Sequence, residues 1–166
     1  RVPLQIVWPG HIEGGQRIAG ATSLVDVTAT ILDAGGAELD QVAAMQLDGD
    51  SLLPLMQGDP GEWKDEAFSE HLAHGTDRAR AMIRRGRWKL CYSHGTPPDI
   101  ELYDLESDQG EFDNLADHAE HRAIRAELVA RVMEIWSDPD RLTEEIVASQ
   151  QSRKMIREVL GDSPIF

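Results

Sequence analysis

The sequence contains almost no cysteine: Cys91 is the single one among 166 residues. No disulfide can therefore join two parts of the chain, and this use of cysteine fits a reducing compartment such as the cytoplasm. No signal-peptide pattern opens the sequence, and its first residue is Arg1 rather than Met. Because Arg1-Val2-Pro3 leads straight into an apolar segment, we expect the chain to come from a longer protein.

Long apolar runs and basic stretches are also absent. No apolar run approaches the roughly 20 residues that span a bilayer, so we expect no membrane segment. The net charge is −14, and acidic residues outnumber basic ones in each third of the chain. We therefore expect no nucleic-acid partner, because nucleic-acid-binding proteins present clustered lysine and arginine. The apolar share of 41% and the charged share of 28% are those of a soluble globular protein.

Residues 1–58 have the pattern of a strand followed by a helix. An apolar alternation over 4–8, closed by Pro9-Gly10, predicts a short strand. Ser23 fits a helix N-cap with Asp26 three residues on, as in a capping box. The two elements predict a βα piece at the edge of a larger α/β sheet. The helix is indicated by one apolar stripe and a glycine stop: Leu24, Val27, Thr28, Ile31 and Leu32, then Gly35-Gly36.

Residues 59–137 predict a small antiparallel sheet packed by one long helix. Apolar residues repeat every four positions in the expected helix 119–137, which Asp138-Pro139 should end. Residues 138–166 then form a helical arm with too few apolar side chains for a core of its own. We expect this arm to contact another subunit of a homo-oligomer. The four strands are expected at 67–72, 79–85, 87–92 and 102–105, with a turn at Gly86.

Glu70 and His71 are the pair that we single out as candidate substrate-binding residues. They end a predicted strand and precede a loop that contains Gly75, an ordinary position for residues of a site. The alternative interpretation is that Glu70 is a charge on the exposed edge of the sheet.

The other reactive side chains fit structural roles. Cys91 lies inside a predicted strand and is interpreted as a structural cysteine. Asp48-Gly49-Asp50 begins like a calcium loop, but Leu52 stands where the next oxygen ligand should be. The pair His71 and His74 lacks a third ligand, so we predict no metal site in this chain. A basic cluster is expected to pair with nearby carboxylates, with sulfate binding as the alternative: Arg84, Arg85, Arg87 and Lys89.

The segment from Glu101 to Leu115 is the most informative part of the sequence. It predicts a strand, an acidic turn over 106–111, and a return of Phe112 and Leu115 to the core. Its residues resemble a closing signature of the sulfatases, in which a Leu-Tyr-Asp-Leu strand precedes an acidic turn and an Asn-Leu anchor. Four further stretches resemble the C-terminal part of these enzymes: Arg1 to Gly10, Ser23 to Leu32, Asp48 to Leu55 and Met82 to Leu90.

The resemblance covers residues 1–137 in order and implies the C-terminal portion of a sulfatase of the alkaline-phosphatase superfamily. The implied fold is the sulfatase type of α/β fold, with 1–58 at the edge of the large domain and 59–137 as the small sheet. The complete enzyme would hydrolyse a sulfate ester with a formylglycine and with calcium or another divalent metal. Cys91 does not match the formylglycine motif Cys-X-Pro-Ser/Ala-Arg, and no metal ligand or catalytic residue of the family maps onto this chain. We therefore expect the rest of the sulfatase chain as a partner, no cofactor in this chain, and no activity from it alone.

Phe68 to His71 and the arm near 138–160 are most similar to the choline-sulfatase branch. The resemblance implies that Glu70 lies near the cationic end of the substrate, whereas His71 stands where an aromatic residue is expected. A carboxylate suits a quaternary ammonium, because that cation cannot donate a hydrogen bond. Two other functions stay open: a phosphonate or phosphate monoester hydrolase of the same superfamily, and a non-catalytic oligomerisation module.

Overall fold

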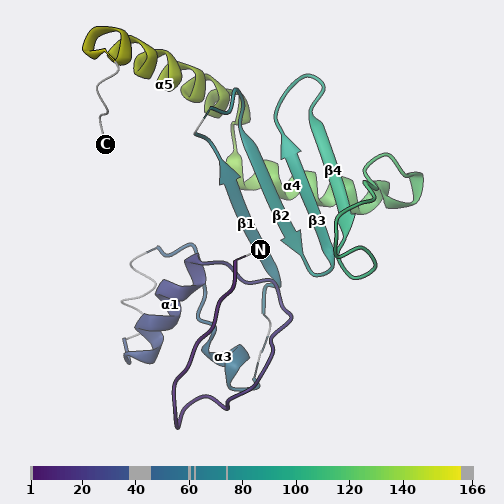
Figure 1. The fold of residues 1–166 in the computed structure, drawn as a ribbon. Coiled ribbons are helices and arrows are strands. Elements are labelled where there is room, and N and C mark those ends of the chain that lie inside the picture. Colours follow the sequence, from purple (N-terminus) through teal and green to yellow (C-terminus); the bar gives the residue numbers. More distant parts are fainter. Residues whose placement is uncertain (1, 38–45, 60, 62, 74, 162–166) are drawn as a thin grey trace. The chain divides into compact units, whose positions relative to one another are not determined.

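The computed structural model describes residues 2–37, 46–59, 61, 63–73 and 75–161. The chain divides into two compact units, Arg1–Ala67 and Phe68–Phe166 (Figure 1). The finer division of the sequence at 58 and 137 stays a prediction.

Four strands form one sheet in the order β1-β2-β3-β4. β3 pairs antiparallel with both β2 and β4, so that Leu90 lies between Ile83 and Leu102. Gly86 has a φ of 56° and supplies the left-handed residue of the tight turn between β2 and β3. The prediction of four short strands is confirmed, although β4 begins at Asp99 rather than 102, because Asp99 already pairs with Ser93. The strands are β1 (Glu66–His71), β2 (Arg80–Arg85), β3 (Trp88–Ser93) and β4 (Asp99–Asp104).

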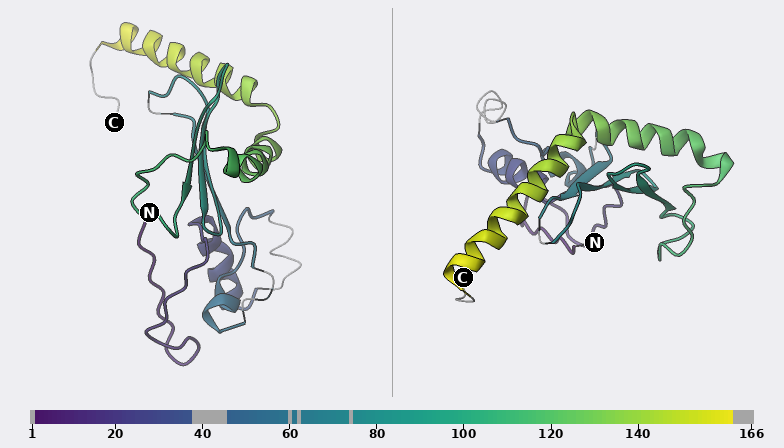
Figure 2. Two further views of the ribbon diagram at one scale, coloured as in Figure 1. Left: turned by 90° about the vertical axis from the view of Figure 1, so that its right-hand side faces the viewer. Right: turned by 90° about the horizontal axis from the view of Figure 1, so that it is seen from above.

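Helix α4 (Arg122–Trp136) covers one face of this sheet and follows the short 3-10 helix η1 (Ala119–His121) (Figure 2). Leu128 and Val132 lie on the side of α4 that meets the strands, and both are fully buried. The predicted helix over 119–137 and its four-residue apolar repeat are confirmed. The helix and the strands share one apolar core: Ala79, Ala81, Ile83, Leu90, Tyr92, Leu102, Ala116, Leu128, Val132, Trp136 and Ile146.

Helix α5 (Pro139–Leu160) begins directly after the break that Asp138-Pro139 predicts. Ser137 has a φ of 60°, and the Asp138 carboxylate accepts a hydrogen bond of 2.9 Å from the N–H of Arg141. The first half of α5 packs on the core through Leu142 and Ile146. The second half extends past the sheet and leaves three apolar side chains exposed: Met155, Ile156 and Val159 (Figure 1).

The first unit contains α1 (Val25–Ala34) and the single-turn helix α3 (Leu53–Met56). α1 ends at the predicted glycines, with a φ of 73° at Gly36. The strand expected over 4–8 is not formed, since these residues lie in neither a helix nor a strand. A strand needs a hydrogen-bonding neighbour, and the described residues of this unit provide none for it.

The buried face of α1 differs from the apolar stripe in the sequence. Leu24 and Ile31 are 59% and 65% exposed, whereas Asp26 and Thr30 are buried. The N–H groups of the segment 50–52 donate to the Asp26 carboxylate and the Thr30 hydroxyl, which turns the polar side of the helix inward. The sequence therefore predicted the helix but not the face that is buried.

Candidate functional site

Glu70 lies in the edge strand β1, and its carboxylate is held by α4. Trp136 donates a hydrogen bond of 2.9 Å from its Nε1 to Glu70 Oε2. The Trp136 ring meets the rings of Phe68 and Tyr92 edge on, at centroid distances of 6.5 and 6.0 Å. Because Glu70 is exposed, its negative charge is presented to solvent beside an aromatic cluster.

His71 is exposed too, and alternation along the strand places it on the opposite face of β1 from Glu70. Both residues are among those that line one cavity of about 320 Å³, although the Glu70 carboxylate is turned toward Trp136 of α4. His74 lies outside the described residues. The remaining lining comes from all four strands: Ser69, Arg80, Ala81, Met82, Cys91, Tyr92, Ser93, Asp99 and Glu101.

Cys91 borders this cavity from the middle of β3, between Met82 and Glu101 of the neighbouring strands. Burial raises the pKa of the Cys91 thiol above its ordinary value. A thiol that keeps its proton is a poor nucleophile. The environment of Cys91 thus favours the structural role over a catalytic one.

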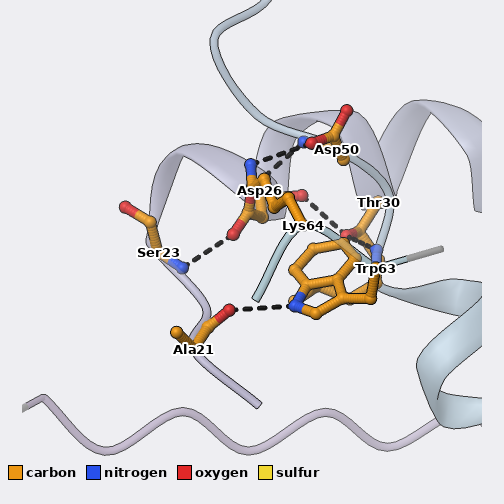
Figure 3. A network of polar contacts seen from close by, with 8 residues as sticks. Ala21, Ser23, Asp26, Thr30, Asp50, Trp63 and Lys64 are labelled. Atoms are coloured by element: carbon orange, nitrogen blue, oxygen red, sulfur yellow. Dashed lines mark hydrogen bonds and ion pairs between the residues drawn. The ribbon is translucent and has the colours of Figure 1, made fainter. Parts of the chain in front are cut away.

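The buried carboxylate of Asp26 organises the first unit (Figure 3). It accepts hydrogen bonds from the N–H groups of Ser23 at 2.7 Å and Asp50 at 3.0 Å, and from Lys64 Nζ at 2.9 Å. The bond from Ser23 is one half of the predicted capping box, but the N-cap of α1 is Leu24 rather than Ser23, and no side chain of the described residues caps the helix. Lys64 Nζ also lies 2.9 Å from the Asp50 carboxylate.

Lys64 occupies the space between the carboxylates of Asp26 and Asp50. Partial burial lowers the pKa of Lys64, but the hydrogen bonds and charges of Asp26 and Asp50 outweigh it and raise the pKa above its ordinary value. The lysine is therefore a cation placed between two carboxylates. This arrangement supports the interpretation of 48–50 as a turn rather than a calcium loop.

The basic cluster is engaged with other protein groups. Arg84 donates from Nε to the carbonyl of Gly86 at 3.1 Å, and the other three side chains pair with carboxylates. The prediction of carboxylate pairing is confirmed for these three, which leaves less positive charge for a bound sulfate. The pairs are Arg85 with Glu127 at 2.9 Å, Arg87 with Asp104 and Glu106, and Lys89 with Glu111.

The acidic turn after β4 is closed by its own side chains. Asp104 accepts hydrogen bonds from Arg87 Nε at 2.6 Å and from Ser107 Oγ at 2.8 Å. The bonds from Arg87 hold the pKa of the Asp104 carboxyl far below its usual range, although burial opposes the shift. Asn114 Oδ1 accepts from the N–H of Leu102 at 3.0 Å and so fastens the end of the turn to β4.

Leu115 packs against the core as predicted, but the prediction for Phe112 is wrong. Phe112 is 88% exposed. The Asp108 carboxylate accepts hydrogen bonds from the N–H groups of Phe112 at 2.7 Å and Asp113 at 2.9 Å. These bonds fix the backbone conformation of the turn so that the Phe112 ring points into solvent.

The sequence analysis missed one group of possible metal ligands. His118, Glu120 and His121 each place a ligand atom within 4.8 Å of the others. The sequence signal was available, because His-X-Glu-His puts three donors within four residues.

None of the helices in the described part of the chain is long and apolar enough to cross a bilayer.

Comparison with known proteins identifies relatives of the same kind. Residues 1–138 match the family described as N-sulphoglucosamine sulphohydrolase, C-terminal. The chain is 36% identical over 130 residues to a choline-sulfatase of Rhizobium meliloti (strain 1021), covering 78% of this chain and 24% of that protein. It is 34% identical over 126 residues to arylsulfatase K of Homo sapiens, covering 69% and 22%. The chain thus spans about a quarter of the length of the curated relatives it matches.

Two solved structures of hydrolases are similar to this chain. A putative sulfatase from Bacteroides thetaiotaomicron VPI-5482 aligns with a TM-score of 0.54 at 26% identity, over 66% of this chain and 23% of that one. A phosphonate monoester hydrolase of Agrobacterium radiobacter aligns with a TM-score of 0.51 at 27% identity, over 70% and 25%. Three findings support one assignment: the family match, the sulfatase relatives, and the four-stranded sheet with its long helix. The chain belongs to the sulfatase family as a C-terminal domain.

Proposed function

We propose that this chain is the C-terminal part of an enzyme that hydrolyses a small sulfate ester. The match of residues 1–138 to a sulfatase C-terminal family carries this proposal. The choline-sulfatase and arylsulfatase K relatives are nearly equally identical to this chain, at 36% and 34%. Their shared reaction class, hydrolysis of a sulfate ester, is therefore proposed rather than one substrate.

The nucleophile and the metal ligands of that enzyme are proposed to lie in the remainder of the protein. The loop at 48–50 does not fit the metal of a sulfatase, because the carboxylates of Asp26 and Asp50 are paired with Lys64. Cys91 does not fit a formylglycine precursor, since Tyr92-Ser93-His94-Gly95 follows it.

Hydrolysis of paired esters tests the reaction class. The protein that contains this chain should release sulfate from choline sulfate or an aryl sulfate faster than it cleaves the matching phosphonate monoester. The purified 166-residue chain should release none. A preference for the phosphonate would instead support the alternative suggested by the Agrobacterium radiobacter neighbour, and turnover by the chain alone would refute the proposed location of the catalytic centre.

Glu70 is proposed to favour substrates with a cationic end. Glu70 is among the residues that line the cavity, and its exposed carboxylate, which Trp136 orients, can compensate the charge of a quaternary ammonium. His71 borders the same cavity and is proposed as a second contact to the substrate. The competing interpretation is that Glu70 serves as the hydrogen-bond acceptor of Trp136.

Two substitutions separate these roles. Glu70→Gln keeps an oxygen for Trp136 but removes the charge, so KM for choline sulfate should rise about tenfold while KM for an uncharged aryl sulfate stays the same. Glu70→Ala should in addition lower stability by about 1 kcal/mol, since the Trp136 N–H loses its partner. Glu127→Gln on α4 is the matched control. Equal changes for both esters would reject the role in cation selection.

The distal half of α5 is proposed to join two copies of the chain in a homo-oligomer. Its exposed apolar residues lie among basic ones, whereas the first half of the helix is acidic, so two antiparallel copies would bring opposite charges together. Because the first half belongs to the core, the test is a truncation after Gln151, measured by light scattering. An unchanged particle mass would show that this segment does not hold an oligomer. The first half carries Asp140, Glu144 and Glu145 against Arg141, and the distal half carries Arg153, Lys154 and Arg157 against Glu158.

A further inference from the structure

The group formed by His118, Glu120 and His121 has the donor atoms of a transition-metal site. Their ligand atoms lie within 4.8 Å of one another, and His118 Nδ1 is 3.9 Å from Glu120 Oε1. The two imidazole rings are stacked, with an interplanar angle of 18° and centroids 6.2 Å apart. Small side-chain rotations would bring all three donors within bonding distance of one ion. In the described part of the chain this is the one such group of three.

The backbone that carries these residues is fixed before any ion binds. The N–H of His118 donates to the carbonyl of Leu115 at 3.1 Å, and the N–H of His121 donates to the carbonyl of His118 at 3.1 Å. Leu115 is itself bonded to Leu102 of β4 at 2.8 Å. The His121 ring also lies against Trp88 of β3, with centroids 5.2 Å apart. The site therefore rests on the sheet rather than on a free loop, which lowers the entropy lost on binding.

Neighbouring charges leave the donors available. Among the described residues, Glu120 pairs with His118 and with no lysine or arginine. The nearby Arg125 is directed to the Ala116 carbonyl at 3.1 Å and to Asp117 at 3.8 Å. Both His118 and Glu120 are more than half exposed, so an ion can reach them from solvent.

We propose that His118, Glu120 and His121 bind one divalent transition-metal ion of the zinc class. Two imidazole nitrogens and one carboxylate oxygen form a ligand set suited to Zn²⁺, with a further position left to water. Calcium and magnesium prefer oxygen ligands and are not expected here. The site is independent of the proposed sulfatase activity, since it lies on η1 and not at the cavity beside Glu70.

Titration of the 166-residue chain with ZnCl₂ tests the site, with isothermal calorimetry as the readout. We expect one saturable component that is absent with CaCl₂. His118→Gln and His121→Gln should each weaken zinc binding by at least about 10-fold. Removing a group that only contacts a metal ligand already costs roughly 10-fold, and these variants remove a ligand itself. Copper(II) bound in place of zinc should give an electron paramagnetic resonance spectrum with coupling to two nitrogens, reduced to one in either variant.

His11→Gln is the matched control, because it also removes one exposed imidazole but lies in the other unit. It should leave zinc binding unchanged. The same titration in urea should lose the saturable component, since the hydrogen-bonded backbone positions the ligands. Three results would each overturn the proposal. They are zinc affinity weakened equally by His11→Gln, zinc affinity unchanged in the double variant of His118 and His121, and equal zinc binding by the unfolded chain.

Discussion

The two units of this chain are stabilised by different kinds of burial. Among the described residues, the largest fully buried side chains of the second unit are all apolar: Ile83, Leu90, Leu102, Leu128 and Val132. The corresponding side chain in the first unit is a carboxylate, Asp26. The second unit thus has one large apolar core, whereas the first combines a smaller apolar cluster around Leu52, Leu53 and Met56 with directed polar bonds to Asp26.

This difference predicts different sensitivity to substitution. An apolar core loses stability in proportion to the contacts removed, and its neighbours can partly relax. A buried carboxylate with several partners leaves all of them unsatisfied when it is lost. The first unit also leaves apolar side chains exposed, with Val2 at 71%, Val7 at 75% and Ile31 at 65%. Its apolar cluster around Leu52, Leu53 and Met56 is smaller than the core of the second unit, so less apolar burial is available to compensate.

The largest effect is expected from Asp26→Ala. This change removes the acceptor of Ser23, Asp50 and Lys64 and should destabilise the first unit by about 3–5 kcal/mol. Hydrogen exchange followed by mass spectrometry should show faster exchange in α1 and around 50–53, while the sheet stays protected.

Asp59→Asn, an exposed carboxylate of the same unit, is the control and should change nothing. Gly49→Ala approaches the same loop by another route, because a Cβ at this position would lie 2.3 Å from the Val25 carbonyl oxygen. It should expose the same segments as Asp26→Ala. Normal protection in both variants would mean that the polar network does not hold this unit.

Leu90→Ala tests the apolar core from the other side of the comparison. Leu90 is fully buried between Ile83 and Leu102, so we expect a loss of about 2–5 kcal/mol in the free energy of unfolding. Chemical denaturation followed by circular dichroism measures it. Val129→Ala, at a half-buried position of α4, is the smaller matched deletion. A greater loss at Val129 than at Leu90 would contradict the location of the core.

The same contrast explains which features could be predicted from sequence. The sheet and α4 follow from local patterns, because alternation and the four-residue repeat ending at Trp136 reflect one apolar core. The buried face of α1 could not be predicted, since it depends on Asp50 and Lys64, which are 24 and 38 residues from Asp26. Glu70 was identified by its position and by resemblance, but its bond to Trp136 joins residues 66 apart and left no local signal.

A smaller effect, dependent on pH, is expected at the Asp104 turn of the second unit. Because the folded carboxyl has a pKa below its ordinary 3.8, the folded state binds this proton less tightly than the unfolded state. Its contribution is therefore complete above about pH 5 and is lost as the pH falls through and below 3.8. Asp104→Asn should cost about 2 kcal/mol at pH 7 and flatten the acid limb of the stability curve.

Asp117→Asn is the control for that measurement, because its carboxylate is 99% exposed and lies 3.8 Å from Arg125. Urea denaturation at pH 7, 5 and 3 gives the comparison. If Asp104→Asn and the unaltered chain lose stability in parallel from pH 5 to pH 3, the ion pair with Arg87 does not shift the titration of this carboxyl.

The smallest effect should come from Glu127→Ala, which breaks a polar contact of the apolar unit. The Arg85–Glu127 pair joins β2 to α4, but its side chains are 44% and 55% exposed, so water can replace either partner. We expect a loss below about 1 kcal/mol that disappears in 1 M salt, where the screening length falls to about 3 Å. Arg131 and Glu134, another exposed pair of α4, provide a matched case through Glu134→Ala. A loss at Glu127 comparable with that at Asp26 would remove the contrast between the units, since α4 would then depend on a directed polar bond as α1 does. If Glu127→Ala changes the free energy of unfolding by nearly zero, the apolar contacts of the neighbouring Leu128 are sufficient to hold α4, and the stability of the second unit comes from its core.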